Sequence, residues 1–171
     1  MSDSKFIKAT PGPKSSVIYE TKDGRKFCYS KGNWTWRNNN PGNLVPGEVS
    51  KRNGAIGKAG GFAVFPDYES GHKAHLDCLR TTYKNSDLED LIQAYAPEED
   101  DNDTENYVQF LRKKTGVKGD KKVKDFTKDE FEKLWKAIEQ MEGQKAGEIK
   151  ECTEKRPEKK KEESQKLKII G

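Results

Sequence analysis

Two glutamates stand at the predicted ends of helices, where a carboxyl group can be partly buried and act as an acid. Glu69 begins a helix after the short apolar strand at residues 62–65, with Asp67 just before it. Glu142 ends a later amphipathic helix, immediately before a glycine. Hydrolysis of a glycosidic bond needs a protonated acid at the leaving oxygen and usually a second carboxylate. The placement of these residues favours that chemistry.

Each glutamate also has a simpler explanation. The helix dipole favours an acid in the first turn, which is sufficient to account for Glu69. The same dipole opposes an acid at a C-terminal end, so Glu142 needs another reason, and solvent exposure is one. Glu20, in a predicted hairpin, and Glu48, in a glycine-rich stretch, are further candidates. The residues alone leave the choice of acid open.

An amide-rich segment at residues 33–43 is the predicted binding loop for a polar ligand. It places two tryptophans before a run of asparagines that also contains a proline and a glycine. Asparagine tolerates left-handed backbone conformations and bonds to nearby main chain, so we expect a rigid, irregular loop. Aromatic faces and amides displayed by such a loop suit a sugar. The predicted substrate-binding residues are Trp34, Trp36, Asn38, Asn39, Asn40, Asn43, Asp67 and Tyr95.

The elements that position these residues follow from local patterns. Runs of β-prone residues at 17–21 and 25–29 lie on either side of an Asp-Gly pair, which is a strong hairpin signal. Residues 44–61 carry many glycines and few apolar anchors, which predicts a mobile excursion before the strand at 62–65. Four helices are then expected, at residues 68–84, 87–95, 103–114 and 127–142.

The last of these helices is the best defined. Thr127 and Glu130 match a capping box, in which each side chain bonds to the main chain of the other residue. Its apolar residues recur at helical spacing and predict one buried face. They are Phe131, Leu134, Trp135, Ile138 and Met141.

Together these elements predict an α+β domain with a small N-terminal β lobe and a helical lobe of about four helices. We expect a flexible lead at residues 1–16, the domain at 17–149 and a charged, solvated tail at 150–171. A sheet lobe set against a helical lobe leaves a cleft, which is the usual place for a ligand.

Composition argues against several classes of protein. The net charge is only +4 and both signs are abundant, so the average surface does not suit nucleic acid. No apolar run approaches the roughly 18 residues of a membrane span. The first residues have no apolar segment of the kind a signal peptide requires, which predicts synthesis in the cytoplasm.

Metal and thiol chemistry have weak support. His72 and His75 are the only histidines, and without a third ligand we expect them on an exposed helix face. Cys28, Cys78 and Cys152 are scattered and odd in number, so we expect reduced thiols, with Cys78 packed in the core. No metal and no cofactor is predicted.

Several short motifs in a fixed order carry a family resemblance. They are Trp-Arg-Asn-Asn-Asn-Pro-Gly-Asn-Leu at 36–44, Gly-Ala-Ile-Gly at 54–57, Gly-Phe-Ala-Val-Phe-Pro at 61–66, Tyr-Ala-Pro at 95–97, Asn-Asp-Thr-Glu-Asn-Tyr at 102–107, and Glu142-Gly143. In this order the chain resembles a group of phage and secretion-system cell-wall hydrolases, over about residues 18–149. The resemblance implies a lysozyme-like fold and a muramidase-type activity on peptidoglycan.

A weaker likeness connects the chain to the flagellar-type glucosaminidases. Residues 38–44, 62–70 and 95–107 follow the order of an Asn-rich turn, a strand that runs into a Glu-Ser helix start, and a tyrosine-containing segment. In those enzymes the catalytic glutamate ends a helix upstream of the Asn-rich turn, whereas only a hairpin precedes it here. The likeness therefore implies either Glu20 in that role or, after a circular permutation, Glu142.

The sequence thus predicts a peptidoglycan hydrolase that cleaves the glycan strand, with Glu69 or Glu142 as the general acid. The likeness to glucosaminidases implies that Tyr107 is an auxiliary catalytic group. The preferred activity is that of a muramidase, and the alternatives are a lytic transglycosylase and a glucosaminidase. Gln144 stands where the family leads us to expect a tryptophan, and its presence would weaken activity if that aromatic lines the cleft. The alternative is a non-catalytic module that binds peptidoglycan or a secretion spike.

The expected partners follow from this prediction. They are peptidoglycan glycan strands, an immunity protein in the producing cell and a secretion-spike carrier, with no role for nucleic acid or membranes. A chain made in the cytoplasm without a signal peptide would reach the periplasm or cell wall by phage or type VI delivery. It would then act as a phage lytic protein or an antibacterial effector.

Overall fold

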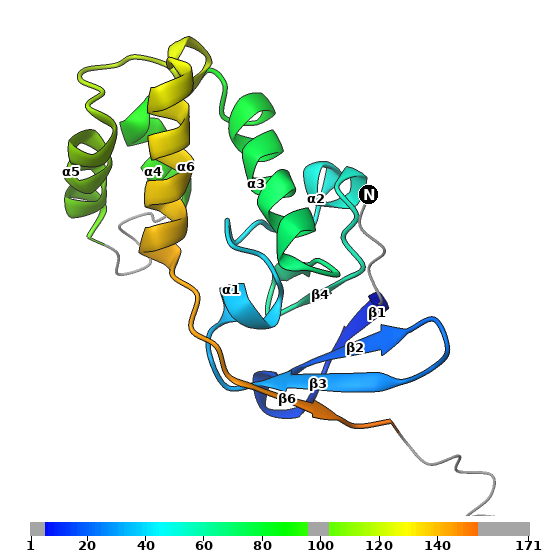
Figure 1. The fold of residues 1–171 in the computed structure, drawn as a ribbon. Helices are drawn as coiled ribbons and strands as arrows, with labels where there is room; N and C mark the ends of the chain where they lie inside the picture. Colours follow the sequence, from blue (N-terminus) through cyan, green and yellow to red (C-terminus); the bar gives the residue numbers. More distant parts are fainter. Residues whose placement is uncertain (1–5, 96–102, 154–171) are drawn as a thin grey trace, which may run out of the picture.

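The computed structural model describes residues 6–95 and 103–153, with a sheet at one end of the molecule and the longer helices at the other (Figure 1). The sheet has four antiparallel strands in the order β1-β2-β3-β6, so its last strand comes from the C-terminal part of the chain. The strands are β1 (Phe6–Pro11), β2 (Val17–Thr21), β3 (Lys26–Ser30) and β6 (Glu148–Glu151).

The predicted hairpin is confirmed as β2 and β3. Val17 lies opposite Tyr29, and Glu20 lies opposite Lys26. Gly24 in the connecting turn has a φ of 90°, a conformation that residues with a Cβ atom rarely adopt. The Asp-Gly pair is therefore a correct indicator of this turn.

Two segments that were predicted to be unstructured are strands of this sheet. Residues 6–11, expected to be part of a flexible lead, form β1, and Phe6 and Ala9 on this strand are buried. β6 crosses the expected boundary between domain and tail, and all four of its side chains are exposed. These predictions are wrong because both segments are held by main-chain hydrogen bonds to strands elsewhere in the chain, which the local sequence does not reveal.

One face of the sheet packs against the amide-rich segment. Val17 and Tyr19 are fully buried there, among aromatic neighbours. The hydroxyl of Tyr19 donates a hydrogen bond to the main-chain oxygen of Arg37 at 2.5 Å. This bond joins the sheet to the first part of the amide-rich segment.

The middle of the molecule is built from short elements. The glycine-rich stretch at residues 44–61, predicted as a mobile excursion, is ordered and contains a helix and a strand. Main-chain bonds hold it in place: Ala9 donates to Ile56 at 3.1 Å, and Ile56 donates to Val64 at 2.8 Å. The short elements are α1 (Trp34–Arg37), α2 (Glu48–Arg52), β4 (Gly57–Ala59) and β5 (Phe62–Val64).

The four longer helices predicted from periodicity are confirmed. The capping box of the last one is present, with main-chain N–H groups of Thr127 and Glu130 each bonded to the other's side chain. The helices are α3 (Tyr68–Thr81), α4 (Leu88–Tyr95), α5 (Thr104–Thr115) and α6 (Lys128–Glu142). Two 3₁₀ turns, Pro13–Ser15 and Val123–Asp125, complete the described elements.

The helical lobe has its own core. Buried side chains from α3, α4, α5 and α6 form one cluster, in which Leu79, Leu91, Leu111, Leu134 and Ile138 are fully buried. The sheet has a separate cluster, so the chain has two lobes of different architecture. The α+β class is therefore correct. In the described part of the chain, no helix combines the length and apolar character that crossing a bilayer requires.

Candidate functional site

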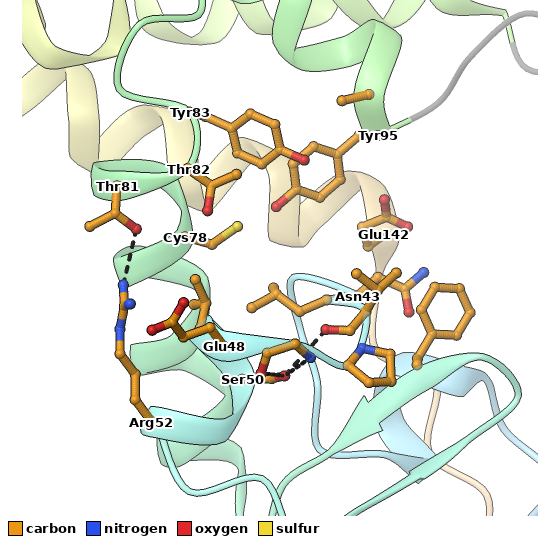
Figure 2. A pocket seen from close by; sticks show the side chains of 17 residues that line it. Asn43, Glu48, Ser50, Arg52, Cys78, Thr81, Thr82, Tyr83, Tyr95 and Glu142 are labelled. Carbon is orange, nitrogen blue, oxygen red and sulfur yellow. Dashed lines mark hydrogen bonds between the residues drawn. The ribbon is translucent and has the colours of Figure 1, made fainter.

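A cavity of about 610 Å³ lies between the helical lobe and the segment that follows the amide-rich loop (Figure 2). Its walls come from the segment at 43–50, from α3 and the turn after it, and from the last residues of α4 and α6. The volume is in the range of small-molecule sites, and the walls combine apolar side chains with a few polar groups. The lining residues include Asn43, Glu48, Cys78, Tyr83, Tyr95 and Glu142.

Glu142 is the last residue of α6, and its carboxyl group lies on the cavity wall between Tyr95 and Asn43 in the view of Figure 2. The side chain is partly buried, and this burial raises its pKa above that of an ordinary glutamate. A helix C-terminus carries partial negative charge, which also disfavours a carboxylate here. A glutamate that keeps its proton to higher pH in a ligand-sized cavity is suited to general-acid catalysis.

The turn after Glu142 is fixed by the start of the amide-rich segment. The main-chain oxygen of Gly143 accepts a short hydrogen bond from the hydroxyl of Thr35 and another from the amide of Asn33 at 3.2 Å. Asn33 and Lys145 exchange two further bonds, at 3.0 Å and 3.1 Å. Residues more than a hundred positions apart in sequence therefore hold the backbone directly after Glu142.

One turn before Glu142, Glu139 binds three side chains of α3. Its carboxylate accepts a bond from the Tyr68 hydroxyl at 2.5 Å and lies 2.7 Å from Nδ1 of His72 and 2.9 Å from Nδ1 of His75. His75 is fully buried, and the Glu139 side chain is only 11% exposed. This cluster ties the last turns of α6 to the first turns of α3.

The charges in this cluster follow from its bonds. Burial alone would raise the pKa of Glu139, but the hydrogen bonds from His75, Tyr68 and His72 outweigh it and lower the pKa. Burial lowers the pKa of His75, although Glu139 acts in the opposite direction. A neutral His75 can donate its Nδ1 proton to a charged Glu139, while its buried Nε2 has no hydrogen-bond partner among the described residues.

The histidine pair corrects one expectation. His72 and His75 were expected on an exposed helix face, yet His75 is fully buried and the His72 side chain is 21% exposed. Glu139 supplies the polar partner that the sequence did not reveal. Within residues 6–95 and 103–153, no group of three or more histidine, cysteine or acidic side chains has an arrangement suited to a metal ion.

Glu69 is not part of the cavity. Its side chain is 65% exposed and pairs with Lys73 one turn later on α3, at 3.3 Å. Asp67 caps the same helix by accepting a bond from the main-chain N–H of Ser70 at 2.8 Å. Asp67 therefore caps the start of α3, and Glu69 is an exposed acid in its first turn. This agrees with the simpler explanation of Glu69, in which the helix dipole favours an acid there. Glu20 lies on β2, 4.0 Å from Lys26, and is likewise absent from the cavity wall.

The asparagine run faces inward. The Asn38 amide donates to the main-chain oxygen of Ala59 at 3.1 Å, and the Asn39 amide donates to that of Phe65 at 3.2 Å. Asn40 makes three bonds of 2.9 Å, two of them with Leu44. These amides bond to the protein's own main chain, so Asn38, Asn39 and Asn40 are not available as the sugar-binding groups we expected.

The two tryptophans also pack within the protein. The guanidinium of Arg37 lies over the Trp34 ring, 4.2 Å from its centre. The Trp36 ring lies 5.2 Å from that of Tyr29, between centroids. Neither tryptophan lines the cavity. Their part in the structure is to connect the amide-rich segment to the sheet.

The remaining predicted residues divide into two groups. Asn43 and Tyr95 line the cavity, and each has a buried side-chain oxygen without a hydrogen-bond partner among the described residues. Tyr107 instead packs against the core of the helical lobe and is not a cavity residue. Residues 96–102, which include part of the motif ahead of Tyr107, lie outside the described residues.

Sequence reasoning missed three groups of this site. Glu139 stands three residues before Glu142, which places both on one side of α6, and this spacing was an available signal. Asn33 and Thr35 sit at the start of the amide-rich segment, but nothing local links them to Gly143. Their role depends on contacts between distant parts of the chain.

Comparisons with known proteins give one partial match. The chain is 35% identical over 98 residues to Protein P5 of Pseudoalteromonas phage PM2. The aligned region is 53% of this chain and spans 61% of the phage protein. No protein-family model matches the chain.

Proposed function

We propose that the protein is a peptidoglycan hydrolase of lysozyme-like fold that cleaves the glycan strand, with Glu142 as the general acid. The observation that carries this proposal is the position of Glu142, a partly buried carboxyl group with a raised pKa on the wall of a cavity of about 610 Å³. The family resemblance of the motifs at 36–44 and 142–143 supports it, because both motifs contribute to the structure around this cavity.

In this proposal Glu142 donates its proton to the glycosidic oxygen as the bond from that oxygen to the anomeric carbon breaks. Positive charge then develops on the sugar ring, and a carboxylate nearby stabilises it. Glu48 on α2 is the other acid among the described cavity residues, and it lies on the opposite side of the cavity in Figure 2. It is the candidate for the second carboxylate. A water molecule then completes hydrolysis.

The sugar would be held by the cavity rather than by the asparagine run. Tyr83 and Tyr95 offer aromatic rings, 5.7 Å apart between centroids, on the helical side. Leu44, Val49 and Phe62 supply apolar surface on the other side, where the methyl group of an N-acetyl substituent would fit. In this proposal Tyr83 and Tyr95 take the place of Trp34 and Trp36 as the aromatic residues that contact the sugar.

The similarity to a phage protein supports a setting in which the chain acts on a bacterial cell wall. On this proposal it is a phage lytic protein or an antibacterial effector carried by a type VI system. It would meet peptidoglycan in the periplasm, and a producing cell at risk would need an immunity protein. A secretion-spike carrier would deliver it.

Digestion of purified peptidoglycan tests the proposal. Wild type should release soluble fragments, and Glu142→Gln should reduce the rate by about 100-fold or more, the usual contribution of a general acid. Glu69→Gln is the matched control, an exposed acid outside the cavity that should keep at least half of the activity. A fully active Glu142→Gln protein would rule out this acid.

Product analysis assigns the chemistry. A muramidase leaves reducing ends on N-acetylmuramic acid and a glucosaminidase leaves them on N-acetylglucosamine, whereas a lytic transglycosylase leaves an anhydro ring. If Glu48→Gln retains activity and the products are anhydro sugars, the second carboxylate is not required and the enzyme is a transglycosylase. Loss of activity in Glu48→Gln with reducing products supports hydrolysis.

A non-catalytic wall-binding module remains the second candidate, and one observation favours it. Gln144 is exposed directly after Gly143, where the family resemblance led us to expect an aromatic residue. Sedimentation with insoluble peptidoglycan separates the two candidates. A protein that co-sediments but releases no fragments at any pH between about 4 and 8 is a binding module.

A further inference from the structure

Two cysteines that are far apart in sequence meet on the outer sheet edge. β3 and β6 pair so that Cys28 lies opposite Lys150. Beyond the strand, the main-chain N–H of Cys152 donates to the oxygen of Lys26 at 2.8 Å, which continues the same register. Side chains alternate between the faces of a strand, so Cys28 and Cys152 project from the same face as diagonal neighbours.

The Cys28 side chain is close enough to influence the pKa of Cys152. Burial raises the pKa of Cys152, and the nearby Cys28 thiol, through charge and a hydrogen bond between the side chains, acts in the same direction. Both residues are partly exposed, so small reagents in solution can reach them. Cys78 differs from them because it is buried on α3, in another part of the molecule.

We propose that Cys28 and Cys152 are an oxidative modification site, at which an intramolecular disulfide joins β6 to β3 in oxidising surroundings. The pairing register brings together two of the three cysteines and leaves Cys78 as the odd one. The sequence predicts reduced thiols, and all three cysteines are free in the structure, but two that are distant in sequence lie on the same face of paired strands. The proposal does not depend on the catalytic function proposed for Glu142.

The chemistry is thiol–disulfide exchange with a small disulfide such as oxidised glutathione, or with the disulfide of an oxidoreductase. A Cys28 thiolate attacks the oxidant, forming a mixed disulfide and releasing one reduced thiol. The Cys152 thiolate then attacks the Cys28 sulfur, which forms the internal bond and releases the second thiol. The two protons lost by the cysteines pass to the two released thiolates, and the oxidant gains both electrons.

The local geometry allows this bond with a small movement. Diagonal neighbours on paired strands have Cα atoms about 7–8 Å apart, whereas a disulfide prefers less than about 7 Å. β6 is an edge strand whose four side chains are all exposed, and Cys152 follows its last residue. Its end can therefore move toward β3 without disturbing a packed core.

The bond would affect both the sheet and the site. β6 begins a few residues after Gly143, whose carbonyl is held by Thr35, so the bond would anchor the chain that leaves Glu142. The bridge encloses a loop of about 120 residues. Closure of a loop this long restricts the unfolded chain, and we expect the melting temperature to rise by about 5 °C or more.

Oxidation of the full-length protein tests the proposal. Folded wild-type protein is incubated in a glutathione redox buffer at about pH 8, quenched with acid, and alkylated under denaturing conditions. Intact mass and peptide mapping then count the free thiols. We expect one remaining thiol, at Cys78, and a linked peptide pair that contains Cys28 and Cys152. The melting temperature is measured on the same samples with and without reductant.

Three variants serve as matched controls. Cys78→Ser should form the same bridge and leave no free thiol. Cys28→Ser and Cys152→Ser should show no internal bridge and no reductant-sensitive melting temperature. Three free thiols in oxidised wild type, glutathione adducts without the internal bridge, or a bridge that includes Cys78 would each overturn the proposal. Because the main result comes from wild type, a variant that folds poorly does not affect it.

Discussion

Nδ1 of His75 lies 2.9 Å from Oε2 of Glu139; the His75 side chain is fully buried and that of Glu139 is 11% exposed. The bond joins the helix that ends at Glu142 to the helix whose later turns line the cavity. Because both helices contribute to the cavity wall, the state of this pair bears on the shape of the site.

Stability should fall as the solution becomes acidic. Burial lowers the pKa of His75, so below its unfolded value of about 6.5 the unfolded chain binds a proton that the folded chain does not. Hydrogen bonds lower the pKa of Glu139, which adds a loss at still lower pH. Melting temperatures measured from pH 8 to pH 4 should decrease below about pH 6.5. In His75→Gln the slope between about pH 6.5 and pH 5 should be smaller than in wild type. An equal slope in both proteins would contradict the assignment.

The catalytic rate should be lost as pH rises through the pKa of Glu142. A general acid must carry its proton, so activity persists below the folded pKa and disappears above it. Burial raises that pKa, and the alkaline limit should therefore lie above the value of about 4.3 for a free glutamate. The measurement is kcat/KM for fragment release against pH. An alkaline limit at or below that of free glutamate would exclude Glu142 as the acid.

Replacement of Glu142 by glutamine should separate stability from activity. A partly buried carboxylate is unfavourable at neutral pH, and the neutral amide removes this penalty. We expect the melting temperature of Glu142→Gln at pH 7 to equal or exceed that of wild type while fragment release falls. A clear loss of stability would instead indicate that Glu142 is a structural residue.

The hydroxyl of Thr35 should influence the site from a distance. It donates to the main-chain oxygen of Gly143, directly after Glu142. Thr35→Val keeps the shape and removes the donor, which should reduce stability by about 1 kcal/mol. If the bond orients Glu142, kcat should fall several-fold while KM changes little. Thr115→Val is the control, since Thr115 is also buried and its hydroxyl bonds to Leu111, away from the cavity.

Asn40 and Asn43 should respond differently to truncation. Asn40 makes three main-chain bonds in a fully buried place, and Asn40→Ala should destabilise the fold by about 2–4 kcal/mol. The KM of the Asn40→Ala variant, measured at a temperature where the variant is folded, should equal that of wild type. Asn43 lines the cavity, and Asn43→Ala should raise KM with a smaller loss of stability. A raised KM in Asn40→Ala, with an unchanged KM in Asn43→Ala, would instead support the asparagine run as the sugar-binding group.

The sequence by itself determined the local elements. The Asp-Gly pair predicted the β2–β3 hairpin because few residues other than glycine adopt the φ of 90° found at Gly24. Helical periodicity predicted α3 to α6, and Thr127 with Glu130 marked the start of α6. These features depend on residues close together along the chain, so their signals are complete within a short window. Glu142 was also a candidate from local sequence alone, because the dipole disfavours an acid at the C-terminal end of a helix.

Only the tertiary structure decided which polar groups are free to act. Asn38, Asn39 and Asn40 have the composition of a binding loop, yet their partners are main-chain oxygens of β4, of β5 and of the residues beside them. The sequence left both Glu69 and Glu142 as candidate acids, but in the folded protein the Glu69 side chain is exposed to solvent and Glu142 is partly buried at the cavity. The pairing of β6 with β3 likewise joins ends of the chain that share no local signal. Burial and partners are properties of the folded chain, because they arise from segments that meet only after folding.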